Sequence, residues 1–405
     1  MLLKTKNKYF VPVVSLILAI LTAMSPFAID TYLPAMPDMA NTFHVTINKV
    51  QLTITLYFLG FALGNFIGGP LSDSFGRKRI AVTGIILYGL SAWSITFASK
   101  IEYVWLLRFI QAFGGGFGTV TAMVFVKDWF EGKQVARMAT IIGMIMMLAP
   151  LFAPVIGTLI IQRYDWKVIF YFLAFFATLL FILIVFVIPE SRKKEHITKQ
   201  ITTQQLFGKY IPFFKSRKAV LMLATVSFAS AGMFVFITGA SFMYIEYFGF
   251  DAKLFPMLFG ANVILQIILS FLNTVLLKKY EPESLLVKGI LLQLVAGLLL
   301  IVFIVILNTP RFEIVFPLII LYIGSLGLIF GNGTAIILNL LPEISGSANA
   351  TIGVSRFVAS FIAGSIPALF HPDNLKPIGL TMFCCALIAS CATYFFNKVH
   401  KTASK

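Results

Sequence analysis

The sequence predicts an all-α integral membrane protein in which twelve membrane-spanning helices form two bundles of six. The 405-residue chain is 59% hydrophobic and only 12% charged, and its mean hydropathy is +0.92. It contains twelve apolar runs, each close to the roughly 20 residues that a helix needs to cross a bilayer. The runs lack the period-two alternation of a β-barrel, and backbone groups in lipid must bond within their own segment, so we expect helices.

The apolar runs fall into two sets of six, separated by a polar and basic stretch. Six plus six is typical of a duplicated transporter, whose two halves rock around a central cavity. We therefore predict an N-terminal six-helix bundle over 1–189, a cytoplasmic linker over 190–218 and a C-terminal six-helix bundle over 219–405. The runs cover residues 10–31, 51–70, 80–98, 103–125, 137–161, 168–189, 219–242, 256–277, 285–307, 314–341, 350–370 and 378–396.

Two segments allow more than one interpretation. The basic and apolar start of the chain resembles a signal peptide, but it shows no clear small-residue cleavage site and many spans follow, so a retained first helix is the simpler reading. In the linker, the stretch "TTQQLFGKYIPFF" (202–214) is either a short surface helix or, as we prefer, a tethering loop.

The strong positive charge of the chain reflects its orientation in the membrane. The 32 Lys and Arg residues outnumber the 16 Asp and Glu residues, for a net charge of +16. If both termini are cytoplasmic, 23 of those 32 basic residues lie in the inner segments, which is the positive-inside bias of membrane proteins. This distribution argues against a nucleic-acid partner. The three cysteines all lie in the last run without metal-ligand spacing, so we expect neither a metal nor another cofactor.

The turn after the second run, "GGPLSDSFGRKRI", places charges of both signs at a helix end. Gly76 permits a tight turn, and Asp73 and Arg77 are placed to pair with each other and to cap helix ends. Asp128, at the inner end of the fourth run, is a second expected partner of Arg77. Such a network can act as a gating latch that forms in one state and breaks in another. A solvated turn with anchoring cations is the alternative.

The same turn resembles the loop after the second helix of the major facilitator superfamily, and the variant "DSFGRK" is similar to its Bcr/CflA drug-resistance branch. "FAIDTYLPAMP", "RFIQAFGGG", "LAPLFAPVIGT" and "GMFVFITGASFMYIEYFG" extend the resemblance, whereas the second-half counterpart "LKKYEPES" is degraded. The resemblance implies a monomeric, proton-coupled exporter of drugs of the chloramphenicol or bicyclomycin type in a bacterial inner membrane. At Ser74 the chain differs from the common family pattern. The residues that match the pattern are Gly69, Leu71, Asp73, Gly76, Arg77 and Lys78.

Two charged residues in the first half are expected inside the membrane. Asp30 lies near the outer end of the first run, and Arg108 lies about 8 Å into the fourth run. Burial raises the pKa of a carboxyl group and a nearby arginine lowers it. We therefore expect Asp30 to carry the exchanged proton and Arg108 to tune it. The alternatives are an interfacial cap beside Pro34 for Asp30, and a structural bond to Gln111 or a backbone carbonyl for Arg108.

Two further charged residues lie in the second half. Glu246 is expected at the outer mouth or as an exposed carboxylate at the end of a loop. Arg356 is expected near the inner face, paired with Glu343, and not in contact with substrate.

The fifth run contains two prolines and two glycines that shape a helix. Pro150 and Pro154 each remove a helix hydrogen bond and bend the chain, and Gly143 and Gly157 allow close approach of neighbouring backbones. In the family that the chain resembles, this pattern of Pro150, Pro154 and Gly157 is an antiporter motif. Routine use of Pro and Gly in membrane helices is the alternative.

A drug-binding pocket is expected to be largely apolar with a few polar groups. Methionines repack around varied ligands and aromatic rings attract cations. Asn262 and Gln266 share one helix face and are costly in lipid. The candidate pocket residues are Phe27, Tyr32, Gln111, Met144, Met147, Phe236, Tyr244, Asn262 and Gln266.

Three functions are compatible with these features. The first is a proton-driven exporter of drug-like molecules. The second is a transporter of a metabolite or sugar by uptake or facilitated diffusion, because a fold does not determine a substrate. The third, a membrane enzyme or sensor, lacks clustered catalytic residues and a visible soluble domain. The sequence contains no P-loop pattern, which argues against ATP as the energy source.

Overall fold

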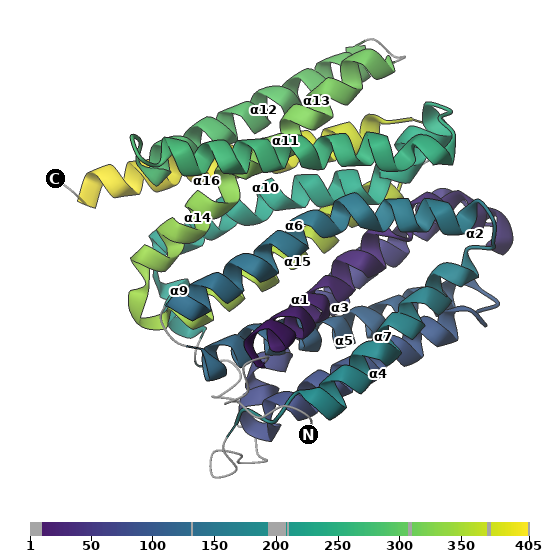
Figure 1. Cartoon of the computed structure of the whole chain (residues 1–405). Coiled ribbons are helices and arrows are strands. Elements are labelled where there is room, and N and C mark those ends of the chain that lie inside the picture. The colour runs from purple at the N-terminus through teal and green to yellow at the C-terminus, as the bar shows by residue number, and fades with distance from the viewer. Residues whose placement is uncertain are drawn as a thin grey trace. The chain divides into compact units, whose positions relative to one another are not determined.

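The structure is a computed structural model of the whole chain, and it describes residues 10–130, 133–192, 208, 210–306, 310–370 and 374–403. Every regular element in these ranges is a helix (Figure 1). Contacts divide the chain into two compact units, one of Met1–Val45 with Leu56–Leu206 and one of Thr46–Thr55 with Phe207–Lys405.

Within its described residues, the first unit contains seven α-helices and one short turn of 3₁₀ helix. In order they are α1 (Phe10–Asp30), η1 (Leu33–Ala35), α2 (Met36–Phe43), α3 (Ile47–Phe75), α4 (Arg77–Ile95), α5 (Ile101–Trp129), α6 (Lys133–Ile161) and α7 (Lys167–Val187). The first nine residues of α3 (47–55) are the part of this helix that groups with the second unit. Helix α5 packs on α4, α4 also packs on α7, and α1 packs on α6.

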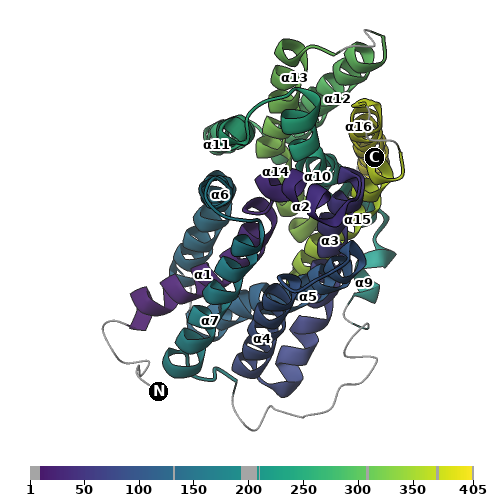
Figure 2. The ribbon, with the colours of Figure 1, turned by 90° about the vertical axis from the view of Figure 1, so that its right-hand side faces the viewer.

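The contact between α4 and α5 brings two helix backbones together. A Cβ atom on Gly84 would overlap the carbonyl oxygen of Gly114, and a Cβ on Gly114 would overlap that of Gly84. Small residues at helix interfaces permit this approach in membranes. The backbones of these two helices are therefore in direct contact at this point, and α4 and α5 lie side by side in Figure 2.

The second unit is built around α10. Its elements are α9 (Ile211–Lys215), α10 (Arg217–Ser241), the π-helical η3 (Phe242–Tyr247), η4 (Ala252–Leu254), α11 (Phe255–Leu276), α12 (Pro282–Ile306), α13 (Phe312–Gly324), α14 (Leu326–Leu340), η5 (Pro342–Ile344), α15 (Ser345–Ala368) and α16 (Lys376–Ala403). Helix α10 packs on α14, α15 and α16. Its buried residues Met222 and Val226 belong to an apolar core that also contains Ile329 of α14.

The twelve predicted runs all lie on helices, with differences at three places. The first run continues beyond Asp30 through η1 and α2, and the tenth is divided at Ser325 into α13 and α14. In the linker, helix α9 occupies part of the stretch that we preferred as a loop, while 202–207 and 209 lie outside the described residues.

Eleven helical segments in the described chain are long and apolar enough to cross a membrane. Helix α4 is the expected span outside this set, and its first turn contains three consecutive basic residues. The fold is therefore an all-α, multi-pass membrane fold, as the hydropathy of the sequence predicts.

Candidate functional site

A charged network lies where α3 ends and α4 begins. Gly76, with φ of 100° and ψ of 144°, separates the two helices. The Arg77 side chain is 5% exposed and donates to Asp73 at 2.5 Å, to Ser72 Oγ at 3.0 Å and to Asp128 at 3.3 Å. Both contacts to carboxylates are salt bridges. Arg77 thus joins the ends of α3 and α5, in the contacts that the sequence motif led us to expect.

Glu190, just beyond α7, closes the N-terminus of α4. Its Oε1 accepts a hydrogen bond from the backbone N–H of Arg77 at 2.9 Å, and its Oε2 accepts one from that of Lys78 at 3.0 Å. The first N–H groups of a helix have no intrahelical partner and carry partial positive charge, so a carboxylate there stabilises the helix. Gly76, at the cap position, has no side chain to perform this role.

A second hydrogen bond joins the start of α4 to the end of α7. The Lys78 ammonium group donates to the carbonyl of Val185 in the last turn of α7, at 2.7 Å. A cation at a helix C-terminus complements the macrodipole, as the carboxylate does at the N-terminus. Ser191 adds a hydrogen bond to Asp128 at 2.6 Å. Our sequence analysis missed Glu190 and Ser191. The one feature that could have pointed to them is their position in "PES", directly at the end of the sixth run.

Arg108 is fully buried in α5. Its guanidinium group donates to Gln111 at 2.9 Å and to the carbonyl of Ala28 in α1 at 3.1 Å. It also lies over the rings of Tyr57 and Tyr32, at 4.5 Å and 5.0 Å from their centroids. Cation–π contacts of this kind stabilise a desolvated arginine.

Asp30 ends helix α1 and is 4% exposed. The expected ion pair between Asp30 and Arg108 is absent: within the described ranges, the salt bridges are those of Arg77. Arg108 instead makes the bonds to Gln111 and to a carbonyl that we considered as the alternative. Ala28 lies two residues before Asp30, so the hydrogen bond to its carbonyl still places the guanidinium group at the C-terminal end of α1.

The polar groups around Arg108 are incompletely bonded. Arg108 Nε and Gln111 Nε2 are buried and have no hydrogen-bond acceptor among the residues that the structure describes. Buried polar groups without a partner are costly. Arg108 and Gln111 therefore each retain one unused hydrogen-bond donor inside the first unit.

Helix α6 approaches the end of α1 through Gly157. A Cβ atom built on Gly157 would lie 1.9 Å from the carbonyl oxygen of Thr31, the residue after Asp30. Pro150 and Pro154 lie inside the same helix. Our expectation of a similar approach at Gly143 is wrong, because no described neighbour comes within 4 Å of a Cβ built there.

The expected pocket residues of the first unit lie in different surroundings. Tyr32 is fully buried against Phe170 at 5.6 Å, and Phe27 stacks on Phe176 at 5.8 Å. Met144 is 51% exposed. The side chain of Met147 lies outside the described residues.

Three expected pocket residues of the second unit come together. Phe236 lies 6.0 Å from the ring of Tyr244, and Asn262 donates to the hydroxyl group of Tyr244 at 3.3 Å. Gln266, one turn after Asn262, is half-buried. These contacts bring α10, η3 and α11 together around Tyr244.

Arg356 of α15 does not pair with Glu343 as expected. Its guanidinium group donates to the hydroxyl group of Ser230 in α10, at 2.9 Å. Glu246 lies in η3 and is exposed, which is the alternative that we gave for it.

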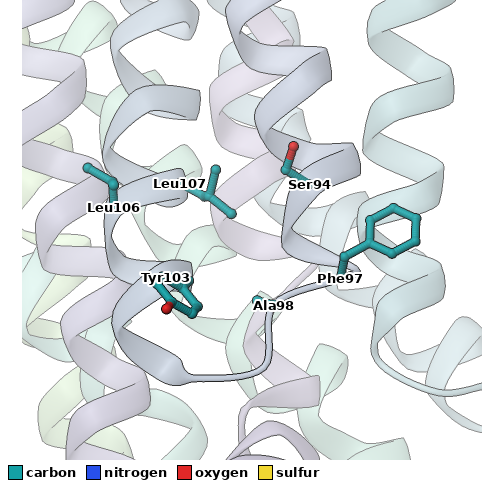
Figure 3. Close-up of a pocket in the computed structure, with 6 residues that line it drawn as sticks. All are labelled: Ser94, Phe97, Ala98, Tyr103, Leu106 and Leu107. Carbon is teal, nitrogen blue, oxygen red and sulfur yellow. The ribbon is translucent and has the colours of Figure 1, made fainter.

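An apolar hollow lies at the connection of α4 to α5 (Figure 3). Its lining contains none of the residues predicted to contact substrate or protons, and consists of Ser94, Phe97, Ala98, Tyr103, Leu106 and Leu107. Among the described residues, no group of three or more His, Cys, Asp or Glu side chains is placed to hold a metal ion.

Comparisons with known proteins agree with this fold. The chain is 32% identical over 386 residues to a bicyclomycin resistance protein homolog of Haemophilus influenzae, covering 94% of this chain and 95% of the relative. It is 26% identical over 283 residues to the multidrug resistance protein MdtL of Klebsiella pneumoniae, covering 69% of this chain and 70% of the relative.

Solved structures share the fold at low sequence identity. A bacterial homolog of the human lysosomal transporter Spinster, inward-facing and occupied, matches with a TM-score of 0.77, 13% identity and 98% of each chain covered. The xylose transporter XylE of E. coli matches with a TM-score of 0.71, 13% identity, and 96% of this chain and 98% of its own covered.

The family model described as Major Facilitator Superfamily matches residues 18–364, which is most of the chain. With the helical fold and the charged turn between α3 and α4, this match identifies the chain as a member of the major facilitator superfamily.

Proposed function

We propose that the chain is a drug efflux transporter that exchanges its substrate for protons. The names of the bicyclomycin and multidrug resistance relatives support the export of drug-like molecules. The positive-inside distribution of Lys and Arg supports an inner membrane location with cytoplasmic termini. We propose that it works as a monomer, and the two compact units support a rocking mechanism.

Asp30 carries the exchanged proton. The observation behind this assignment is a carboxyl group that is 4% exposed and has no salt bridge within the described residues. An ionised carboxylate without a partner is costly to bury, so proton uptake compensates for the loss of water around it. Arg108 of α5 donates a hydrogen bond to the carbonyl of Ala28, which lies on α1 together with Asp30. Arg108 thereby positions the end of α1.

The network of Arg77 is the gating latch. Arg77 bridges two carboxylates from different helices, and Glu190 fixes the start of α4 on which Arg77 lies. Because Asp128 lies on α5 and Asp73 on α3, a shift of α5 relative to α3 and α4 breaks the contact of Arg77 with Asp128. The latch thus stabilises one state of the transport cycle over the other.

Dye and drug exchange in inverted membrane vesicles tests this function. With ethidium and chloramphenicol as probes, an imposed proton gradient is expected to drive accumulation of at least one probe, and an uncoupler to abolish it. Asp30→Asn is expected to abolish the gradient-driven component. Glu313→Gln removes an exposed carboxylate and serves as the matched control. Flux that is insensitive to the uncoupler would favour a facilitator, and full coupling in Asp30→Asn would remove Asp30 from the mechanism.

A further inference from the structure

Arg356 is a cation near the middle of a membrane-spanning helix. It lies eleven residues after Ser345, the first residue of α15, or about 16 Å along the helix axis. An arginine at the centre of a membrane helix is costly to insert, and such residues are candidate functional sites. The position of Arg356 therefore needs a partner that offsets this cost.

The helices around Arg356 supply no counter-charge. Helix α15 packs on α10, α14 and α16. None of these four α-helices contains an Asp or Glu residue. The short η5 also contacts α15, and its Glu343 makes no salt bridge to Arg356 within the described residues. Arg356 is also the sole charged residue of α14 and α15. The counter-ion must therefore come from outside this group of helices.

Two contacts hold the guanidinium group in one orientation. Nε donates to Ser230 Oγ at 2.9 Å, and Cζ lies 4.1 Å from the centroid of the Phe330 ring. The Ser230 hydroxyl group donates in turn to the carbonyl of Val226, at 2.7 Å. The two terminal nitrogens of Arg356 donate no hydrogen bond to any residue that the structure describes. An arginine held in this way presents a planar pair of donors, which matches a carboxylate.

A pair of aromatic rings lies on the two helices that carry Arg356 and Ser230. Phe357, beside Arg356, lies 5.3 Å from the ring of Phe234, which is one helical turn from Ser230. Gly353, one turn before Arg356, has no described neighbour within 4 Å of a built Cβ. Arg356 itself is partly exposed. An aromatic group attached to a carboxylate bound at Arg356 could pack against these phenylalanine rings.

We propose that Arg356, held by Ser230 and Phe330, binds the carboxylate of an aromatic substrate. The assignment rests on the proposed transport function, because the bound molecule is the exported one. One guanidinium group with no second cation on α14 or α15 suits a monoanion and not a phosphate dianion. Ser230 is a positioning residue, since its hydroxyl group holds Nε and leaves the terminal nitrogens for the substrate.

Equilibrium binding to the purified full-length protein in detergent tests this site. The probes are 2-naphthoate and 2-naphthamide, which share one ring system and differ in charge, and binding is followed by their fluorescence polarisation. The wild-type protein is expected to bind 2-naphthoate at least about tenfold more tightly, since hydrogen bonds to charged groups contribute about 1.5–3 kcal/mol. Sodium chloride at equal concentration is expected to displace it weakly.

Variants separate the roles of charge and geometry. Arg356→Gln is expected to bind the two probes equally, and Arg356→Lys to keep part of the preference, because an ammonium group retains charge without the planar pair of donors. Ser230→Ala is expected to reduce the preference without removing it. Arg311→Gln, which removes an exposed arginine outside these helices, is the matched control and is expected to retain the preference.

Three results would overturn the proposal. They are equal binding of both probes by the wild type, an unchanged preference in Arg356→Gln, and displacement by chloride as effective as by 2-naphthoate, which would indicate a site for inorganic anions. Failure of proton coupling is a separate outcome, because this binding requires no gradient. Asp30→Asn is expected to retain the preference for 2-naphthoate even where it abolishes coupled transport.

Discussion

Substitution of Gly157 by alanine tests whether the close approach of α6 to the end of α1 is needed for transport. The built Cβ would lie 1.9 Å from Thr31 O, 2.9 Å from Thr31 C and 3.1 Å from Pro34 Cγ, whereas real Cβ contacts essentially never fall below 3.0 Å. Helix α6 or the segment at Thr31 must therefore move by at least 1.1 Å. Backbone lies on both sides of the contact, so no rotamer change relieves it.

The expected effects follow from that displacement. Overpacking of this kind costs about 1–3 kcal/mol of stability. Because Thr31 follows Asp30 directly, the shift also moves the carboxyl group that we assign to the proton, and a misplacement of about 1 Å can lower activity by about 10²-fold. We expect Gly157→Ala to lower both the unfolding temperature and the coupled exchange rate.

Gly143→Ala is the matched control because it makes the same chemical change in the same helix. A Cβ at Gly143 has no described neighbour within 4 Å, and alanine is favoured over glycine in a helix interior by about 0.5–1 kcal/mol. Gly143→Ala is expected to be neutral or slightly stabilising. Thermal unfolding in detergent and ethidium exchange in vesicles measure the two effects. If the two variants behave alike in both assays, the close approach at Gly157 has no role.

Two other substitutions address the turn between α3 and α4. Glu190→Gln is expected to lower stability by about 0.5–1 kcal/mol, measured by thermal unfolding, because the charge at the N-terminus of α4 is lost while an acceptor remains. Glu246→Gln, which removes an exposed carboxylate away from a helix N-terminus, should be neutral. An unchanged melting temperature in Glu190→Gln would show that the contact contributes nothing. Gly76→Ala is expected to cost about 1–3 kcal/mol, since φ of 100° with ψ of 144° is a region essentially restricted to glycine. Gly76→Asn should be as destabilised, and rescue by asparagine would contradict this conformation.

Hydropathy was sufficient to predict the helices but not their ends or breaks. The second run was expected over 51–70, yet α3 covers Ile47–Phe75 because its polar ends continue as helix beyond the apolar window. The tenth run changes from α13 to α14 at Ser325 within uninterrupted apolar sequence. A period or a mean hydropathy contains no information about such a break, since both sides are equally apolar.

The candidate site was predictable where its contacts are local or belong to a motif. Asp73 and Arg77 are four residues apart, which brings their side chains together across the turn. Glu190 comes from a position 113 residues after Arg77 and looked like the start of a linker. Depth alone suggested Asp30 as the partner of Arg108. Depth does not choose between a carboxylate and a carbonyl on the same helix, and the structure contains the bond to the carbonyl.

The backbone contact between α4 and α5 restricts how this protein can evolve. Arg108 lies on α5, and Gly114 of the same helix meets Gly84 with no room for a methyl group on either side. A residue larger than glycine at either position would push α5 away from α4, and Arg108 would move with α5. A side chain such as Met144 of α6, which is 51% exposed, is under no such restriction.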